Sequence, residues 1–515
     1  MAGPCALAAA LTLFQLSTRS LWLDEGASVS IATQHGSALW SAIGHDGGNM
    51  LAYYLLLHVL IGLFGDAAAV IRLPSVIATL ATVAIVGLLG RRLFDNRVAF
   101  AAGLLSAVSL PLVFWGQDAR GYAPLIMVVA GSFLAFMAIV ETPEDRSPSR
   151  LALVAYGASI VLAAYLGFAG ALVVPAQLLM LLWRRRRARV VLGAVAVAAV
   201  GCVPLLLLAA NRGSSQLFWV PRPNAKGIGQ MLRWLTSAGM PPNFRATATG
   251  TLALVVSVAG LLAAAGLILA RLRRAGRAPE SASGPAERAR PAPEREAWAG
   301  ALLLSWLAIP MLLSLAESAS GQPILLYRNS VICMPAVALL LAWALLRTRL
   351  PMALGWLGVG ALLALRAVPL IASYGIAPED WKAAEQHVVA GARPGDCVVF
   401  YPLDGRMPFD FYVRARGDGL RAPTPVSPAT PWARVRPFVE DYATPGSGQL
   451  QRIESGCPGL WLVVSHQGQR HGPPGSRTNY VRYRALQATL QEAYPHHGTR
   501  VFGYASQVRV EQLRR

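Results

Sequence analysis

The stretch SLWLDEGASVS, residues 20–30, places two adjacent acids, Asp24 and Glu25, directly after an apolar run that begins at residue 3. Adjacent acids stand out in this chain, because only 14% of its 515 residues are charged and 55% are hydrophobic. Soluble domains are typically about one quarter charged. The composition therefore predicts a membrane protein, with the acidic pair at the mouth of its first membrane-spanning segment.

The positive charges are concentrated between apolar segments. The chain has 46 Lys and Arg against 26 Asp and Glu, which gives a formal net charge of +20. Much of the excess lies in short runs at 90–97, 184–189, 271–277 and 347–349. Such runs are typical of cytoplasmic loops under the positive-inside rule. We interpret them as topology signals and predict no nucleic-acid partner.

Hydropathy predicts about eleven transmembrane helices. A helix that crosses the ~30 Å hydrocarbon core needs about 20 apolar residues. We expect spans at 3–18, 73–90, 98–116, 122–140, 151–166, 168–183, 190–210, 249–270, 298–316, 330–346 and 351–371. The first span is short enough to be mistaken for a signal peptide and is compatible with a start further upstream. In either case the segment that begins at residue 20 is exported.

The basic loops orient these helices. With the loops inside, the external segments are 19–72, 117–121, 211–248, 317–329 and the chain after 371. This alternation holds only if the apolar stretch at 50–65 does not cross the membrane. That stretch is short and carries His58 and two tyrosines, which suits a helix lying at the interface. The predicted location is the bacterial cytoplasmic membrane, with an exported C-terminal tail.

The tail differs in composition from the helical domain at 1–371. The segment 278–297 is rich in Pro, Ala and charge and predicts a disordered cytoplasmic linker. In the tail at 372–515, short buried strands alternate with amphipathic helices, which predicts a small α/β domain. Two cysteines lie in this domain, Cys397 and Cys457, and a disulfide between them is compatible with export.

Charges of both signs gather on the predicted outer face. A carboxylate there can take a proton from an acceptor hydroxyl as it attacks the anomeric carbon of a sugar. Arginine side chains can hold a departing lipid phosphate, because their forks match phosphate oxygens. This mixture of groups is what glycosyl transfer from a polyprenyl-phosphate sugar requires. The charged residues placed on this face are Asp24, Glu25, Asp46, Arg72, Arg120, Arg222, Lys226 and Arg328.

Four motifs carry a resemblance to a known family. In order, they are SLWLDEGASVSIA (20–32), HDGGNMLAYYLLLHVLIGLFGD (45–66), VIRLPSVIATL (70–80) and FWGQDARGYAPLIMV (114–128). They resemble the multi-pass GT-C glycosyltransferases, and most closely family 39/83, which includes protein O-mannosyltransferases and the lipid A aminoarabinose transferase. The ordered resemblance covers about residues 1–140, whereas 141–371 resembles the family by hydropathy alone.

The resemblance implies a GT-C-like fold with an interfacial helix in the first external loop. It also implies that an acid in that loop acts as the base, which matches Asp24. Tyr53 and Tyr54 match a family motif, but the Pro-Pro pair and the basic residue that usually precede them are absent from GGNMLAYY. This departure argues against close identity with the aminoarabinose transferase.

Each acid has a structural alternative to its functional role. Asp24 is the predicted general base, or else the N-cap of a helix over 25–34. Glu25 is assigned to the catalytic pair, positioning the acceptor or tuning Asp24, or else is a first-turn acid favoured by the helix dipole. Asp46 is assigned to substrate binding, or else caps the interfacial helix.

The basic residues and tyrosines are assigned to substrate binding. Arg120 contacts the donor phosphate or else pairs with Asp118, and Arg328 contacts the donor or extends to lipid headgroups. Arg72 has the same two alternatives. Two further cations in a long loop, Arg222 and Lys226, meet the donor or anionic lipid. Tyr53, Tyr54 and Tyr122 complete the predicted binding site.

The predicted function is that of a glycosyltransferase, transferring a hexosyl or pentosyl group. Its partners are a polyprenyl-phosphate-linked donor, a glycan, lipid or protein acceptor, and membrane lipids. A flippase or transporter for lipid-linked oligosaccharides and a non-catalytic envelope assembly protein are the alternatives. No metal site is predicted, and the sequence leaves divalent-metal dependence, the sugar and the acceptor open.

Overall fold

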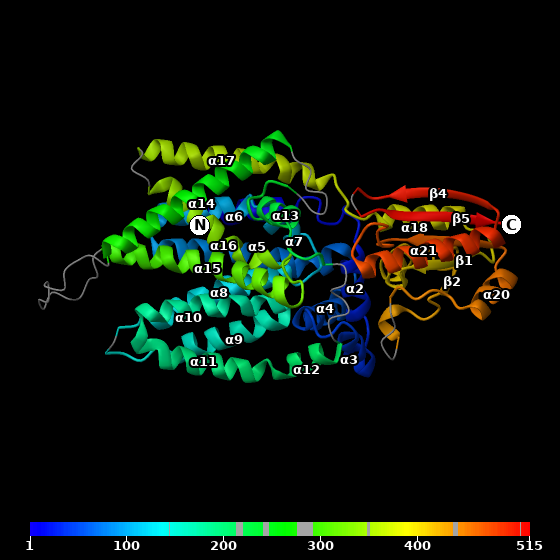
Figure 1. Cartoon of the computed structure of the whole chain (residues 1–515), viewed down its shortest axis with the longest axis horizontal. Helices are drawn as coiled ribbons and strands as arrows, with labels where there is room; N and C mark the ends of the chain where they lie inside the picture. The colour runs from blue at the N-terminus through cyan, green and yellow to red at the C-terminus, as the bar shows by residue number, and fades with distance from the viewer. Residues whose placement is uncertain are drawn as a thin grey trace, which may run out of the picture.

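The chain folds into a long helical domain with a smaller α/β domain at one end (Figure 1). The computed structural model describes residues 1–143, 145–212, 220–239, 247–275, 292–347, 351–435, 441–504 and 506–515. Of the predicted linker at 278–297, residues 278–291 lie outside this description. Residues 292–297 are helical, since helix α15 (Ala292–Ser320) begins at Ala292.

Six described helices are long and apolar enough to cross a membrane: α5 (Ala68–Leu93), α8 (Tyr122–Val140), α14 (Ala248–Ala275), α15, α16 (Met334–Leu346) with the 3₁₀ turn before it, and α17 (Met352–Tyr374). Two bent pairs raise the total to eight: α6 (Asn96–Ala107) with α7 (Leu110–Gly116), and α11 (Ala188–Gly201) with α12 (Val203–Arg212).

The three other predicted spans are short apolar helices in the structure. Span 3–18 becomes α1 (Ala2–Leu13) and 151–166 becomes α9 (Arg150–Leu166). Span 168–183 becomes α10 (Val174–Leu179) with a 3₁₀ turn at each end. The chain is therefore a multi-pass membrane protein, while the count of eleven spans stays a prediction.

The predicted interfacial stretch forms α4 (Leu51–Phe64). Tyr53 and Tyr54 lie on its buried side, and Leu63 and Phe64 are exposed. These exposed side chains suit contact with lipid. The interfacial assignment stays a prediction.

The predicted span at 98–116 is broken between α6 and α7, which meet at 59°. Pro111 lies in the first turn of α7 and has no backbone N–H to continue the helix before it. Arg366, buried in α17, donates from Nη1 to the carbonyl of Leu105 near the end of α6. The break tilts α7 so that the chain after Gly116 turns into the loop at 117–121.

The α/β domain contains a mixed five-stranded sheet of order β2-β1-β3-β5-β4. The strands are β1 (Cys397–Tyr401), β2 (Thr424–Ser427), β3 (Gly459–Val464), β4 (His496–Phe502) and β5 (Val508–Arg514). The helices are α18 (Trp381–Gly391), α19 (Arg406–Arg416), α20 (Ser447–Gly456) and α21 (Pro474–Ala493). Strand β1 is parallel to β2 and β3, and β5 is antiparallel to β3 and β4. The short buried strands that the sequence predicts at 396–402 and 459–468 correspond to β1 and β3, which are buried along their whole length.

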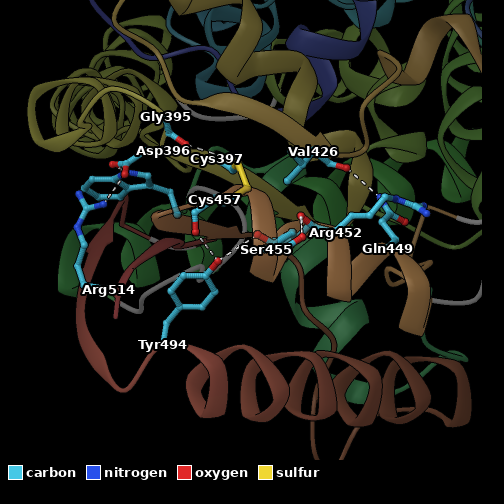
Figure 2. The surroundings of a disulfide bond; sticks show 12 residues. Gly395, Asp396, Cys397, Val426, Gln449, Arg452, Ser455, Cys457, Tyr494 and Arg514 are labelled. Atoms are coloured by element: carbon cyan, nitrogen blue, oxygen red, sulfur yellow. Dashed lines mark hydrogen bonds and ion pairs between the residues drawn. A yellow bond between two sulfur atoms is a disulfide. The ribbon is translucent and has the colours of Figure 1, made fainter.

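A disulfide joins Cys397 at the start of β1 to Cys457 after α20, with 5.7 Å between the Cα atoms (Figure 2). Tyr494 donates its hydroxyl to the carbonyl of Cys457. The neighbouring Asp396 pairs with Arg514 at 2.6 Å. The bridge therefore links β1 to the end of α20, and both cysteines are buried.

Candidate active site

The two adjacent acids lie in the first turn of α2 (Leu23–Ala32). The N-cap is Trp22, so Asp24 is not the cap that the sequence allowed as its alternative. Successive side chains on an α-helix are rotated by about 100°. Asp24 and Glu25 therefore point in different directions and meet different partners.

Asp24 is paired with an arginine from a distant part of the chain. Its Oδ2 lies 2.6 Å from Nη1 of Arg328, and both side chains are partly exposed, at 25% and 19%. The guanidinium of Arg328 also stacks over the ring of Trp22. Burial raises the pKa of Asp24, but the charges of Arg328 and Arg120 outweigh it and hold that pKa below its usual value. The side chain is thus a carboxylate at neutral pH.

Arg120 connects Asp24 to a second acid. Its Nη1 donates to the carbonyl of Asp24 (3.4 Å), the hydroxyl of Ser28 (3.3 Å) and the hydroxyl of Tyr54 (3.1 Å). Tyr54 in turn donates to Oδ2 of Asp46 at 2.7 Å. Burial raises the pKa of Asp46 to about 6, although Arg120 and Tyr54 oppose the shift. The cluster therefore holds two carboxyl groups of unequal basicity beside one arginine.

The turn that presents Asp46 explains why this acid is not a cap of α4. Asp46 follows α3 (Gly36–His45), and the N-cap of α4 is Met50. Gly47 and Gly48 have φ of 73° and 74°, a region that only glycine enters without strain. The Gly-Gly pair thus reverses the chain and leaves the Asp46 side chain directed at Tyr54.

Glu25 and Arg72 form a separate, fully buried ion pair. The contact is bidentate, with Nε–Oε1 at 2.7 Å and Nη2–Oε2 at 2.8 Å, and neither side chain is exposed. The backbone N–H of Ala119 also donates to Glu25, and Nη1 of Arg72 donates to the carbonyl of Leu16. This pair ties α2 to α5 and to the loop at 117–121, which favours a structural role for both residues.

Asp118 takes a different partner from the one that the sequence suggested. Its Oδ1 accepts a hydrogen bond from Nε1 of Trp22 at 2.8 Å, rather than pairing with Arg120. Its Oδ2 has no hydrogen-bond partner among the described residues. Burial, followed by the nearby charge of Glu25, raises the pKa of Asp118 well above its usual value. Arg120 is thereby left directed toward Asp24.

The remaining predicted residues divide into those near the cluster and those outside it. Tyr122 packs on Trp115 and lies within electrostatic range of Arg328. Tyr53 is fully buried and donates to the carbonyl of Ile71. Arg222 and Lys226 are exposed, and Arg222 donates to a backbone carbonyl of α15. The structure does not bring these two cations to Asp24.

Several residues at the cluster were absent from the sequence prediction. Tyr327 accepts a hydrogen bond from Nε of Arg328. Glu379, from the α/β domain, accepts one from the N–H of Leu23 and lies 3.3 Å from His466. These residues lie hundreds of positions from Asp24 and form no local motif, so no sequence signal points to them. Within the described residues, no three His, Cys, Asp or Glu side chains are grouped to hold a metal ion.

Comparison with known proteins shows the fold class. Residues 49–209 match the family model of dolichyl-phosphate-mannose-protein mannosyltransferases. By structure, the whole chain is similar to solved GT-C glycosyltransferases, so it is a membrane protein with the GT-C fold and the resemblance drawn from its motifs is confirmed. No curated protein matches the chain by sequence.

Three solved structures illustrate this similarity. ArnT from Cupriavidus metallidurans in the apo state aligns with a TM-score of 0.55 at 15% identity, over 99% of this chain and 97% of that chain. The same protein bound to undecaprenyl phosphate gives 0.52 at 16% identity with the same coverage. The Archaeoglobus fulgidus oligosaccharyltransferase tethered to an acceptor peptide gives 0.54 at 12% identity, over 98% of this chain and 73% of that chain.

Proposed function

We propose that this protein is a glycosyltransferase that moves a sugar from a polyprenyl-phosphate donor to a lipid, glycan or protein acceptor. The observation that carries the proposal is the contact between the Asp24 carboxylate and Arg328, beside Arg120, in a partly exposed cluster. The fold supports it, and so do similar structures that contain undecaprenyl phosphate or a dolichol phosphate. Reaction at the outer face of the bacterial cytoplasmic membrane is part of the same proposal.

The cluster supports a single displacement. Arg328 and Arg120 hold the donor phosphate, and Asp24 takes the proton of the acceptor hydroxyl. The acceptor oxygen then forms a bond to the anomeric carbon while the bond from that carbon to the phosphate oxygen breaks. Polyprenyl phosphate leaves with the electron pair, and the two guanidinium groups neutralise its charge.

Donor binding also changes the basicity of Asp24 in this mechanism. In the structure, Arg328 pairs with Asp24 and helps to lower its pKa. A phosphate that takes over the guanidinium removes this stabilisation of the carboxylate. Asp24 then becomes a stronger base only when the donor is bound. The proton of the acceptor hydroxyl is therefore taken mainly when the donor is present.

The experiment that tests the function is a transfer assay in membranes with a panel of radiolabelled polyprenyl-phosphate sugars. Label that moves to an acceptor only when the protein is present supports the proposal, and the donor that works identifies the sugar. Movement of the intact lipid-linked sugar across the bilayer, without transfer, would instead assign the chain to the transporters.

Replacement of either cluster arginine should weaken donor binding. A charge-assisted hydrogen bond contributes about 1.5–3 kcal/mol, which corresponds to about one to two orders of magnitude in affinity. Arg120→Gln and Arg328→Gln should therefore raise the KM for the donor about 10- to 100-fold. Arg328→Lys should restore part of the loss, because lysine keeps the charge but lacks the fork.

The matched control is Arg477→Gln, which removes an exposed arginine of α21 in the α/β domain. Its donor KM should equal that of the wild type. An unchanged donor KM in both cluster variants would assign Arg120 and Arg328 to other roles, such as contact with lipid headgroups.

Labelling with a membrane-impermeant thiol reagent tests the proposed orientation. We choose three exposed serines, Ser37, Ser147 and Ser447, as single cysteine sites. The free cysteines at 5, 202 and 333 are replaced by alanine beforehand. In cells whose outer envelope admits the reagent while the cytoplasmic membrane stays intact, positions 37 and 447 should react and position 147 should not. Reaction at position 147 from outside would overturn the topology.

A further inference from the structure

Helix α2 receives no cap from its own N-cap residue, Trp22. Its first amide, the N–H of Leu23, donates instead to Oε2 of Glu379 at 2.9 Å. Glu379 lies 356 positions later in the chain. An acceptor at the start of a helix satisfies an otherwise unpaired amide, and a carboxylate there is further stabilised by the helix dipole. The α/β domain thus supplies the missing cap.

Glu379 is itself held in place from two sides. The oxygen that accepts from Leu23 also accepts from Nε1 of Trp381 at 2.7 Å. The other oxygen, Oε1, lies 3.3 Å from Nε2 of His466, and the Glu379 side chain is 1% exposed. Because both oxygens have fixed partners, the carboxylate has one orientation.

The α/β domain contacts the backbone on both sides of Asp24. Before it, the N–H of Leu21 donates to the hydroxyl of Tyr412 at 2.7 Å. After it, α19 packs so closely on α2 that a Cβ at Gly26 would lie 2.8 Å from the backbone nitrogen of Pro408. The α/β domain therefore positions the backbone that carries Asp24, whereas the arginine partners of Asp24 lie in loops of the helical domain.

We infer that Glu379 is a positioning residue for Asp24, so that the α/β domain forms part of the catalytic unit. Without the cap, the first turn of α2 loses its fixed start, and the Asp24 carboxylate leaves the position set by Arg328. The inference rests on the proposed function, because a loss of turnover reports on it. Arg120 and Arg328 come from other segments, so donor binding should persist without Glu379.

Two readouts test the inference, hydrogen exchange and kinetics. In Glu379→Ala, amide exchange in peptides covering residues 20–30 should be at least tenfold faster than in the wild type. The kcat for transfer should fall at least tenfold, and the donor KM should stay within twofold. In Glu379→Gln, whose amide oxygen still accepts from Leu23, both exchange and kcat should return toward wild-type values.

A matched control separates positioning from general damage to the domain. Glu511→Ala also removes a fully buried carboxylate, which accepts hydrogen bonds from Tyr483 and Gln487 within the same domain. It should leave exchange at 20–30 and kcat unchanged. If Glu379→Ala does not accumulate, Tyr412→Phe, which removes the acceptor for Leu21, should give a smaller rise in exchange at the same peptides.

Wild-type exchange at residues 20–30 in both Glu379→Ala and Tyr412→Phe would overturn the inference, as would equal losses in Glu379→Ala and Glu511→Ala. The exchange readout needs no substrate. A failure of the proposed function, seen as a wild type that transfers no sugar, therefore remains distinguishable from a failure of the positioning role.

Discussion

Replacement of Asp24 by asparagine should lower the rate of sugar transfer by about 10²–10⁴-fold, the range typical of general-base catalysis. Asparagine keeps the shape of the side chain and an acceptor oxygen but cannot take the proton. It also removes the ion pair with Arg328. Since Asp24 and the donor phosphate compete for that guanidinium, undecaprenyl phosphate should bind the variant at least as tightly as the wild type. Turnover and lipid-phosphate binding, measured on the same preparation, check both statements.

The pH dependence distinguishes Asp24 from the second carboxyl group. The pKa of Asp24 lies below its usual value, so in the free enzyme this group stays deprotonated well below neutral pH. The pKa of Asp46 is about 6, so a base at that position would become protonated as pH falls through about 6. With Asp24 as the base, kcat/KM should show no acid limb near pH 6. Wild-type transfer by Asp24→Asn, together with a limb near pH 6, would make Asp46 the base.

Glu25→Gln should strongly lower the stability of the folded protein. If Glu25 positions the acceptor or tunes Asp24, as the sequence predicts, this substitution has a milder effect on turnover than Asp24→Asn. In the structure this substitution leaves the fully buried guanidinium of Arg72 without its counter-ion. Breaking one side of a buried ion pair typically costs about 3–5 kcal/mol. Thermal unfolding in detergent should show a markedly lower transition temperature and a poor yield of folded protein.

The double variant Glu25→Met with Arg72→Met provides the control. Replacing a buried ion pair by apolar side chains of similar size is often neutral or stabilising. The double variant should therefore recover much of the stability lost in Glu25→Gln. A stable but inactive Glu25→Gln would contradict the structural role and return Glu25 to the catalytic pair.

Local patterns in the sequence were enough to predict several parts of the fold. Runs of apolar residues long enough to span a bilayer depend only on neighbouring positions. The largely apolar stretches at 396–402 and 459–468 likewise predicted the strands that form β1 and β3, because a strand covered on both faces has no polar alternation. The other three strands, β2, β4 and β5, went unpredicted. Strands β2 and β4 form the two edges of the sheet, and β4 is largely exposed, so its pairing with β5 leaves no apolar run in the sequence.

The sequence also predicted which charged residues belong to the cluster, but not which of them pair with one another. The sequence placed Asp24, Glu25, Arg72, Arg120 and Arg328 together as candidates for one site. Only the tertiary structure separates the partly exposed pair of Asp24 and Arg328 from the buried pair of Glu25 and Arg72. The reason is that a one-residue step on a helix turns the side chain by about 100°. Which partner each acid meets then depends on how α2 packs against α5 and the segment before α16.

The cap on α2 could not be predicted from the sequence either, and here the two residues in contact lie much farther apart in the chain. By itself, the amino-acid sequence determined a membrane domain rich in basic loops, an acidic pair after the first apolar run, and a tail of different composition. It carried no sign that Glu379 meets Leu23, because a hydrogen bond across 356 positions leaves no periodicity or spacing in the chain. That contact exists only because the α/β domain packs against the start of α2, and packing between domains is a property of three-dimensional surfaces.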